Sequence, residues 1–106
     1  MSEESEKYHK LVRDKIPGML DKKGISYEKI IADKEEYRGC LLEKLVEEAT
    51  EFKEAKNEEE LADVWEVIDA LMKEFQFDHT KIMEIKKKKF DERGGFYQRI
   101  ILKGEK

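Results

Sequence analysis

The sequence predicts an all-α fold organised around a helical hairpin at residues 34–75. Apolar residues recur at intervals of three and four on both sides of Asn57, as they do along one face of a helix. Charged residues make up 45% of the chain, well above the usual fraction, and this fits helices with large exposed faces. The 106 residues form one domain, 1–106, whose small core would gain from oligomerisation.

The N-terminal third predicts one short helix between irregular segments. Residues 1–7 have the composition of a disordered acidic tail and lack the apolar stretch of a signal peptide. Asp14 is placed to cap a short helix with Pro17 in its first turn and Gly24 as its stop. Residues 25–31 have the composition of a short extended segment.

Two long helices are predicted next. Asp33 is expected to cap a helix that runs to about Ala55, and Asn57 to cap a second helix that runs to about Phe75. Each carries an apolar stripe of the kind that faces a core. The two stripes predict that the helices fold back on each other at Asn57.

The C-terminal part predicts a third helix and an extended end. Asp78 or Thr80 is expected to begin this helix, and the glycine pair at 94–95 to end it. Residues 96–102 are rich in residues that favour strands. We expect them to pair with residues 25–31 or with a neighbouring subunit.

Both helices of the hairpin carry the same acidic pattern. The first has Glu47, Glu48 and Glu51, and the second has Glu59, Glu60 and Asp63 at the same spacing. Residues three apart share a helix face, and a tight turn sets residues equidistant from it at the same height. The carboxylates of Glu48, Glu51, Glu60 and Asp63 are therefore expected to converge. A divalent cation such as Mg²⁺ or Mn²⁺ would relieve the repulsion between them. Solvated acidic surface is the alternative.

Composition excludes several classes of function. The net charge of −4 argues against a non-specific nucleic-acid partner. No apolar run reaches the ~18 residues of a membrane span. The single cysteine, Cys40, rules out an internal disulfide, and we expect a reducing, cytoplasmic location.

Several motifs together resemble a known superfamily. The run Lys44-Leu-Val-Glu47-Glu48-Ala-Thr-Glu51, followed by Glu60-Leu-Ala-Asp63-Val, is similar to the MazG / phosphoribosyl-ATP pyrophosphohydrolase superfamily. Two flanking stretches, residues 10–17 and 92–96, resemble a small single-domain branch of it. Members are all-α nucleoside triphosphate pyrophosphohydrolases with a Glu-Glu-x-x-Glu and Glu-x-x-Asp metal motif.

The resemblance implies a set of Mg²⁺ ligands. They are Glu48, Glu51, Glu60 and Asp63. Only eight residues separate Glu51 from Glu60, fewer than in many relatives. A second Glu-x-x-Asp, at Glu66 and Asp69, follows Glu51 after fourteen residues and is the alternative second half of the motif, a second shell or a second metal site.

The resemblance also implies an activity. It is hydrolysis of a nucleoside triphosphate between the α and β phosphates, with removal of non-standard nucleotides as the role. Glu47 or Glu66 would orient or deprotonate the attacking water. Basic residues would hold the phosphates, namely Arg13, Lys15, Lys87 and Arg93.

Other interpretations remain open at this point. A related enzyme would act on phosphoribosyl-ATP or a dUTP-type nucleotide, whereas a non-catalytic helical interaction module would release no pyrophosphate. The apolar side that a lone hairpin leaves uncovered predicts a homodimer or homotetramer that completes a four-helix-type bundle.

Overall fold

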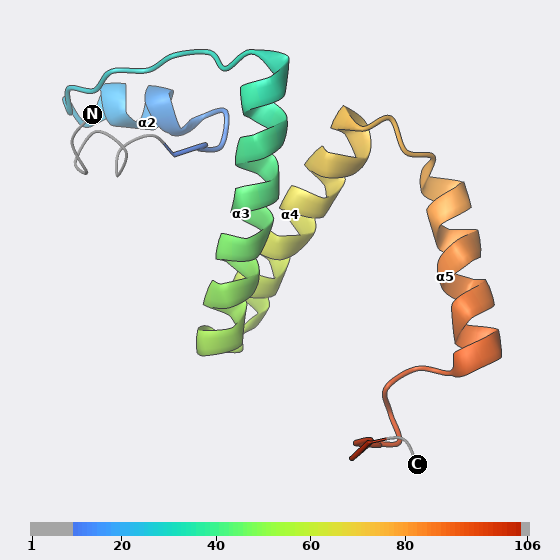
Figure 1. Cartoon of the computed structure of the whole chain (residues 1–106). Coiled ribbons are helices and arrows are strands. Elements are labelled where there is room, and N and C mark those ends of the chain that lie inside the picture. The colour runs from blue at the N-terminus through green and yellow to red at the C-terminus, as the bar shows by residue number, and fades with distance from the viewer. Residues whose placement is uncertain (1–9, 105–106) are drawn as a thin grey trace.

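Helices account for all regular secondary structure in the computed structural model, which describes residues 10–104 (Figure 1). The four helices are α2 (Ile16–Lys22), α3 (Lys34–Ala55), α4 (Glu58–Glu74) and α5 (His79–Arg93). The predicted all-α class is therefore confirmed. The tail expected at residues 1–7 lies outside the described part. No helix within residues 10–104 combines the length and the apolar composition needed to cross a bilayer.

Side-chain caps begin the two helices of the hairpin as predicted. The Asp33 carboxylate accepts a hydrogen bond from the Glu36 backbone N–H, and the Asn57 side chain accepts one from the Glu60 N–H, both at 2.9 Å. These bonds satisfy N–H groups that have no partner inside the helix. Between the helices Lys56 adopts a left-handed conformation with φ 54°, so that the chain reverses within two residues.

The last helix begins and ends with similar chemistry. Asp78, the first of the two predicted starts, accepts hydrogen bonds from the N–H groups of Thr80 at 2.9 Å and Lys81 at 3.4 Å. Gly94 ends α5 with φ 82°, a region that favours glycine. The predicted glycine stop is therefore confirmed.

The predicted start of α2 is wrong. The helix begins at Ile16 after Lys15, and Asp14 makes no capping hydrogen bond. A cap at Asp14 would need the N–H of Ile16 or Pro17. The Ile16 N–H already donates to the Arg13 carbonyl at 3.1 Å, and proline has no N–H to give.

The two segments expected to be extended form no strand. Residues 25–31 lead into α3, residues 96–102 follow α5, and the two lie at opposite ends of the molecule (Figure 1). The predicted pairing between them within one chain is wrong. A two-stranded ribbon is marginal without an apolar face to cover it, so sequence preference alone does not form one here.

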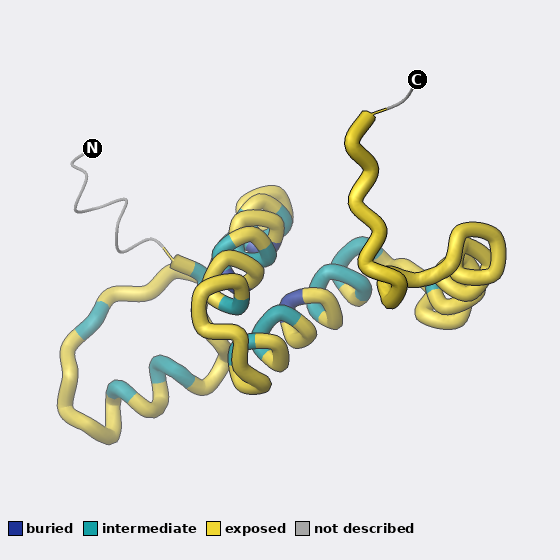
Figure 2. Tube along the Cα trace, turned by 90° about the horizontal axis from the view of Figure 1, so that it is seen from below, coloured by how far each residue is buried: buried dark blue, intermediate teal, exposed yellow. Residues whose placement is uncertain are grey.

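Packing is confined to the seam between α3 and α4. Within the described residues only Leu41 of α3 and Val67 of α4 are buried apolar residues, and the buried positions in Figure 2 lie on the hairpin. No other pair of helices packs extensively. The radius of gyration is 18.4 Å, whereas a compact chain of this length has about 13 Å. The packing of α3 on α4 therefore fixes the relative positions of the candidate site residues on these two helices.

Removing the cap at the turn tests how far the hairpin depends on it. We expect Asn57→Ala to lower the free energy of unfolding by about 1 kcal/mol, because the Glu60 N–H loses its acceptor. Asn57→Ser, which restores a capping oxygen, should recover most of the loss. Urea unfolding followed by circular dichroism checks both variants, and equal stability of Asn57→Ala and wild type would contradict the capping role.

Candidate metal centre

Five carboxylates gather along one side of the seam in two groups that share Glu48. In the first group Glu47, Glu48 and Glu51, all from α3, each bring one oxygen within 4.8 Å of the others. In the second group Glu48 meets Glu60 and Asp63 from α4 at the same separation. The turn thus brings the two acidic motifs together, with Glu48 at the point where they meet.

The four carboxylates predicted to converge are divided between the two groups. Glu51 belongs to one group, Glu60 and Asp63 belong to the other, and Glu48 belongs to both. Three residues along a helix turn a side chain back by about 60°. Glu48 therefore faces the seam and is buried, whereas Glu51 is rotated towards solvent and is exposed.

The shared carboxylate is buried without enough partners. Glu48 is 7% exposed, and its Oε2 atom has no hydrogen-bond partner. The Oε2 atom of Glu60, beside it, is likewise shielded and unpartnered. Burial raises the pKa of Glu48, and a hydrogen bond with Glu51 raises it further, while Lys44 acts in the opposite direction.

These residues fit a divalent cation. Every potential ligand is a carboxylate oxygen, the donor type that Mg²⁺ and Mn²⁺ prefer. Two of the oxygens are buried and lack any other partner, a condition that native proteins rarely tolerate. Either group could hold an ion, namely Glu47, Glu48 and Glu51, or Glu48, Glu60 and Asp63.

Two lysines border the carboxylates on the α3 side. Lys44 Nζ lies 3.3 Å from Glu48 and 3.6 Å from Glu47, and Lys10 Nζ lies 3.8 Å from Glu47. Neither lysine was among the site residues predicted from the sequence. Lys44 precedes Glu48 by four residues, a spacing that pairs charges on a helix, and this signal was available. Lys10 lies 37 residues before Glu47 in the sequence, so no helical spacing predicts their contact.

An arginine borders the carboxylates on the α4 side. The Arg13 Nη2 atom donates to Asp63 Oδ1 at 2.7 Å, across 50 residues of sequence. Arg13 was predicted to contact substrate phosphate, and its position beside the acidic groups suits that role. Its present partner is one of the candidate metal ligands.

The remaining predicted site residues lie elsewhere. Lys87 pairs with Asp91 at 3.0 Å within α5, the helix that also carries Arg93 and does not pack on the hairpin.

Glu66 and Asp69 belong to neither acidic group. Glu66 instead lines a shallow groove on α4, while Lys15 is exposed ahead of α2. The structure therefore gathers the Glu60 and Asp63 pair, not the Glu66 and Asp69 pair.

Comparisons with known proteins found no significant match to a protein family, a curated protein or a solved structure.

The raised pKa of Glu48 predicts how stability depends on pH. A carboxyl group with a raised pKa contributes stability that is complete below its unfolded pKa of about 4.3 and is lost as the pH rises through its folded pKa. We expect Glu48→Gln to melt at a higher temperature than wild type at pH 7 without metal, and the difference to vanish towards pH 4. Thermal unfolding in a chelator across this pH range is the measurement.

Divalent cations should reverse that order. We expect Mg²⁺ or Mn²⁺ to raise the melting temperature of the wild type, because the ion binds the folded state, and to leave Glu48→Gln unchanged. Glu43→Gln is the matched control, since Glu43 is an exposed α3 residue outside both groups. An equal cation response in Glu48→Gln and wild type would remove Glu48 from the ligand set.

Proposed function

We propose that this protein is a Mg²⁺-dependent nucleoside triphosphate pyrophosphohydrolase, with Mn²⁺ as a possible substitute ion. The observation that carries the proposal is the buried, unpartnered Glu48, shared by acidic groups from two helices. A carboxylate in that position is costly unless a cation binds it. The similarity of the Glu48–Asp63 motifs to the MazG-like superfamily supports the reaction class.

The acidic groups would supply the metal ligands. Glu48, Glu60 and Asp63 would form the inner part of the set, and Glu51 would complete it from the solvent side. When bound, Mg²⁺ would neutralise charge on the polyphosphate and lower the pKa of a water molecule. Side chains of this protein would provide the general base and the contacts to the phosphates.

Glu47 is the better candidate for the base. It lies in the acidic group with Glu48 and Glu51, whereas Glu66 lies in neither group. Its side chain is about one-third exposed, so that a water can approach it. Glu47 would accept the proton of the water that opens the anhydride bond between the α and β phosphates, which yields a nucleoside monophosphate and pyrophosphate.

Arg13 is the best placed phosphate contact. Its guanidinium can form two parallel hydrogen bonds to a phosphate, as it can to a carboxylate. A cation held by Asp63 would weaken the ion pair between Asp63 and Arg13, and the Arg13 guanidinium would then be free to bind the polyphosphate. Lys15, two residues further along the chain, would provide a second positive charge.

A nucleotide panel tests the proposal. We expect pyrophosphate release from at least one canonical, damaged or dUTP-type triphosphate, or from phosphoribosyl-ATP, only when Mg²⁺ or Mn²⁺ is present. Glu48→Gln should lower kcat by about 100-fold or more, the scale seen when a single charge-stabilising group is lost. The ranking of nucleotides would identify the substrate class.

The control separates lost chemistry from lost structure. Circular dichroism should give the same helix content for Glu48→Gln and wild type, and Glu43→Gln should keep full activity. Absence of metal-dependent release from every nucleotide would contradict the proposal and favour the non-catalytic interaction module.

A further inference from the structure

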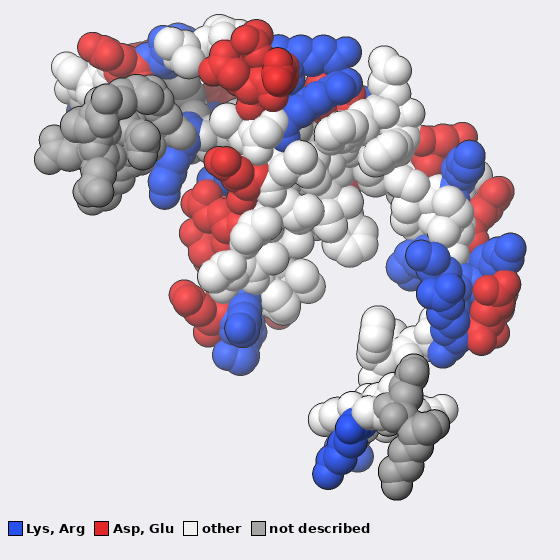
Figure 3. All heavy atoms as spheres, viewed as in Figure 1, with Lys and Arg blue, Asp and Glu red and all other residues white. Residues whose placement is uncertain are grey.

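One whole side of the α3–α4 hairpin is apolar and exposed. On each helix, the residue that directly follows a seam residue points about 100° away from the seam. In antiparallel helices equal offsets point to the same side, and the acidic groups take the other side. We call this surface the apolar side; its members are Leu42, Val46, Leu61, Trp65 and Ile68, all exposed. Figure 3 shows the uncharged surface running over the hairpin.

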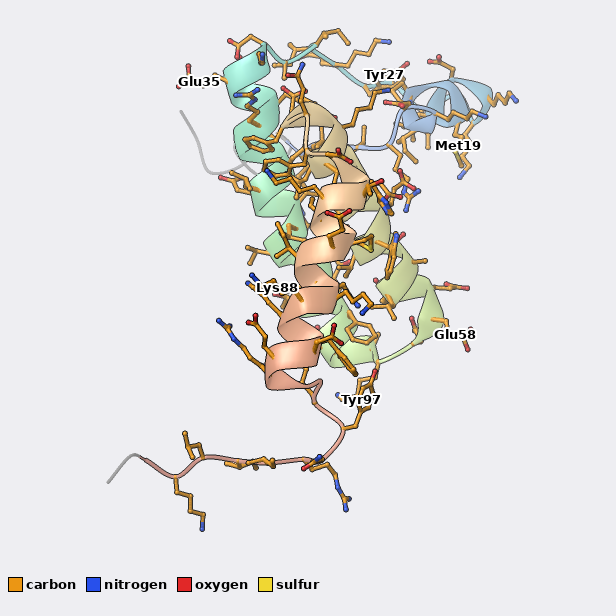
Figure 4. All side chains as sticks on the ribbon, turned by 90° about the vertical axis from the view of Figure 1, so that its right-hand side faces the viewer. Met19, Tyr27, Glu35, Glu58, Lys88 and Tyr97 are labelled. Atoms are coloured by element: carbon orange, nitrogen blue, oxygen red, sulfur yellow. The ribbon has the colours of Figure 1, made fainter. Side chains whose placement is uncertain are left out.

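The C-terminal part of the chain exposes a second apolar surface. We call residues 79–104, which comprise α5 and the segment after it, the arm (Figure 4). Its exposed apolar residues are Met83, Ile85, Phe90, Phe96, Tyr97, Ile100, Ile101 and Leu102. Tyr97 folds back over Gly95, where a Cβ atom would lie 2.8 Å from its ring. The arm thus has a defined bend, and within residues 10–104 no other helix packs extensively on α5.

The hairpin and the arm carry opposite charge. Residues 34–74 contain fourteen acidic and six basic residues, a net charge of −8. Residues 79–104 contain three acidic and eight basic residues, a net charge of +5. Two hairpins placed face to face would bring like charges together, whereas an arm placed on a hairpin brings opposite charges together. Charge therefore favours the arm as the element that covers a hairpin.

The connection between α4 and α5 directs the arm away from its own hairpin. Arg38 of α3 donates to Glu74 at 3.1 Å, and its guanidinium lies 4.9 Å from the centre of the Phe75 ring. Phe75 stacks on Phe77 with ring centres 5.7 Å apart, and the Phe77 N–H donates to the Met72 carbonyl at 2.9 Å. These contacts hold the four-residue connection in one shape. The hairpin that the arm can cover is thus one from another chain.

The exposed area is far larger than a lone chain of this size should have. The accessible surface is 10479 Å², whereas a folded monomer of 12.6 kDa has about 6,200 Å². The excess, on the order of 4,000 Å², exceeds the ~800 Å² per partner of a standard interface, so the chain has enough uncovered surface for a large interface with a second copy.

We propose that a second copy of this chain occupies the apolar side, and that the covering element is its arm. The exchange is reciprocal, so a two-fold axis satisfies both arms and both hairpins at once. The apolar residues of the arm lie on Leu42, Val46 and Trp65 of the partner hairpin. The basic residues of α5 meet Glu58 and Glu66, which line the shallow groove beside Trp65. Assembly does not require metal, so its tests are independent of activity.

Isotope-mixed cross-linking tests the exchange directly. Full-length protein in ¹⁴N and ¹⁵N forms is unfolded together, refolded and treated with a carbodiimide, which joins lysines to carboxylates in contact. We expect arm–hairpin cross-links that pair a light with a heavy peptide. The Lys87–Asp91 pair, in contact within α5, is the internal control and should stay within one isotope. Arm–hairpin cross-links within one isotope only, or none of them, would overturn the proposal.

A substitution on the apolar side provides a second test. Val46 is 66% exposed in the single chain, so Val46→Glu should leave the hairpin folded by circular dichroism. Buried under a partner arm, the same charge should weaken dimerisation by about 10-fold or more. Light scattering at micromolar concentration should give the mass of at least two chains for wild type and Glu43→Gln. A wild-type mass of one chain, or no effect of Val46→Glu, would refute the exchange.

Discussion

The seam between α3 and α4 has to accommodate a carboxylate at its centre. Glu48 is one of only three residues buried within residues 10–104, so the same contact that holds the hairpin also carries its least favourable group. Lys44, whose Nζ atom lies 3.3 Å from Glu48, offsets part of that cost, whereas the neighbouring Glu51 adds to it by raising the pKa of Glu48 further. A packed apolar seam would be more stable without Glu48. A cation bound to the acidic groups would offset the unfavourable free energy of burying the Glu48 carboxylate.

Local chemistry made the helices predictable from the sequence. The three caps, Asp33, Asn57 and Asp78, act on N–H groups two or three residues away, so their effect does not depend on the rest of the fold. The start of α2 was missed because a backbone hydrogen bond replaces the side-chain cap. The absence of strands at 25–31 and 96–102 was missed because a strand needs partners that strand-forming residues do not specify.

The candidate site was predictable only where helix geometry alone decides it. Spacing placed Glu48, Glu60 and Asp63 together across the turn, as the structure has them. Helical spacing could not predict that Arg13 lies beside Asp63. The two residues are 50 positions apart, and their contact depends on the path of an irregular segment. Lys44 passed unnoticed because lysine–glutamate spacings of four residues are common in so charged a chain, and most of them are only surface pairs.

The small core has a consequence for how temperature acts on this protein. The heat-capacity change of unfolding grows with the apolar area that becomes exposed. A single chain that buries only two apolar residues between residues 10 and 104 has little such area to expose. Most of that heat-capacity change would then belong to association. Because apolar association weakens on cooling, the assembled protein would loosen in the cold as well as in heat, with an optimum between the two.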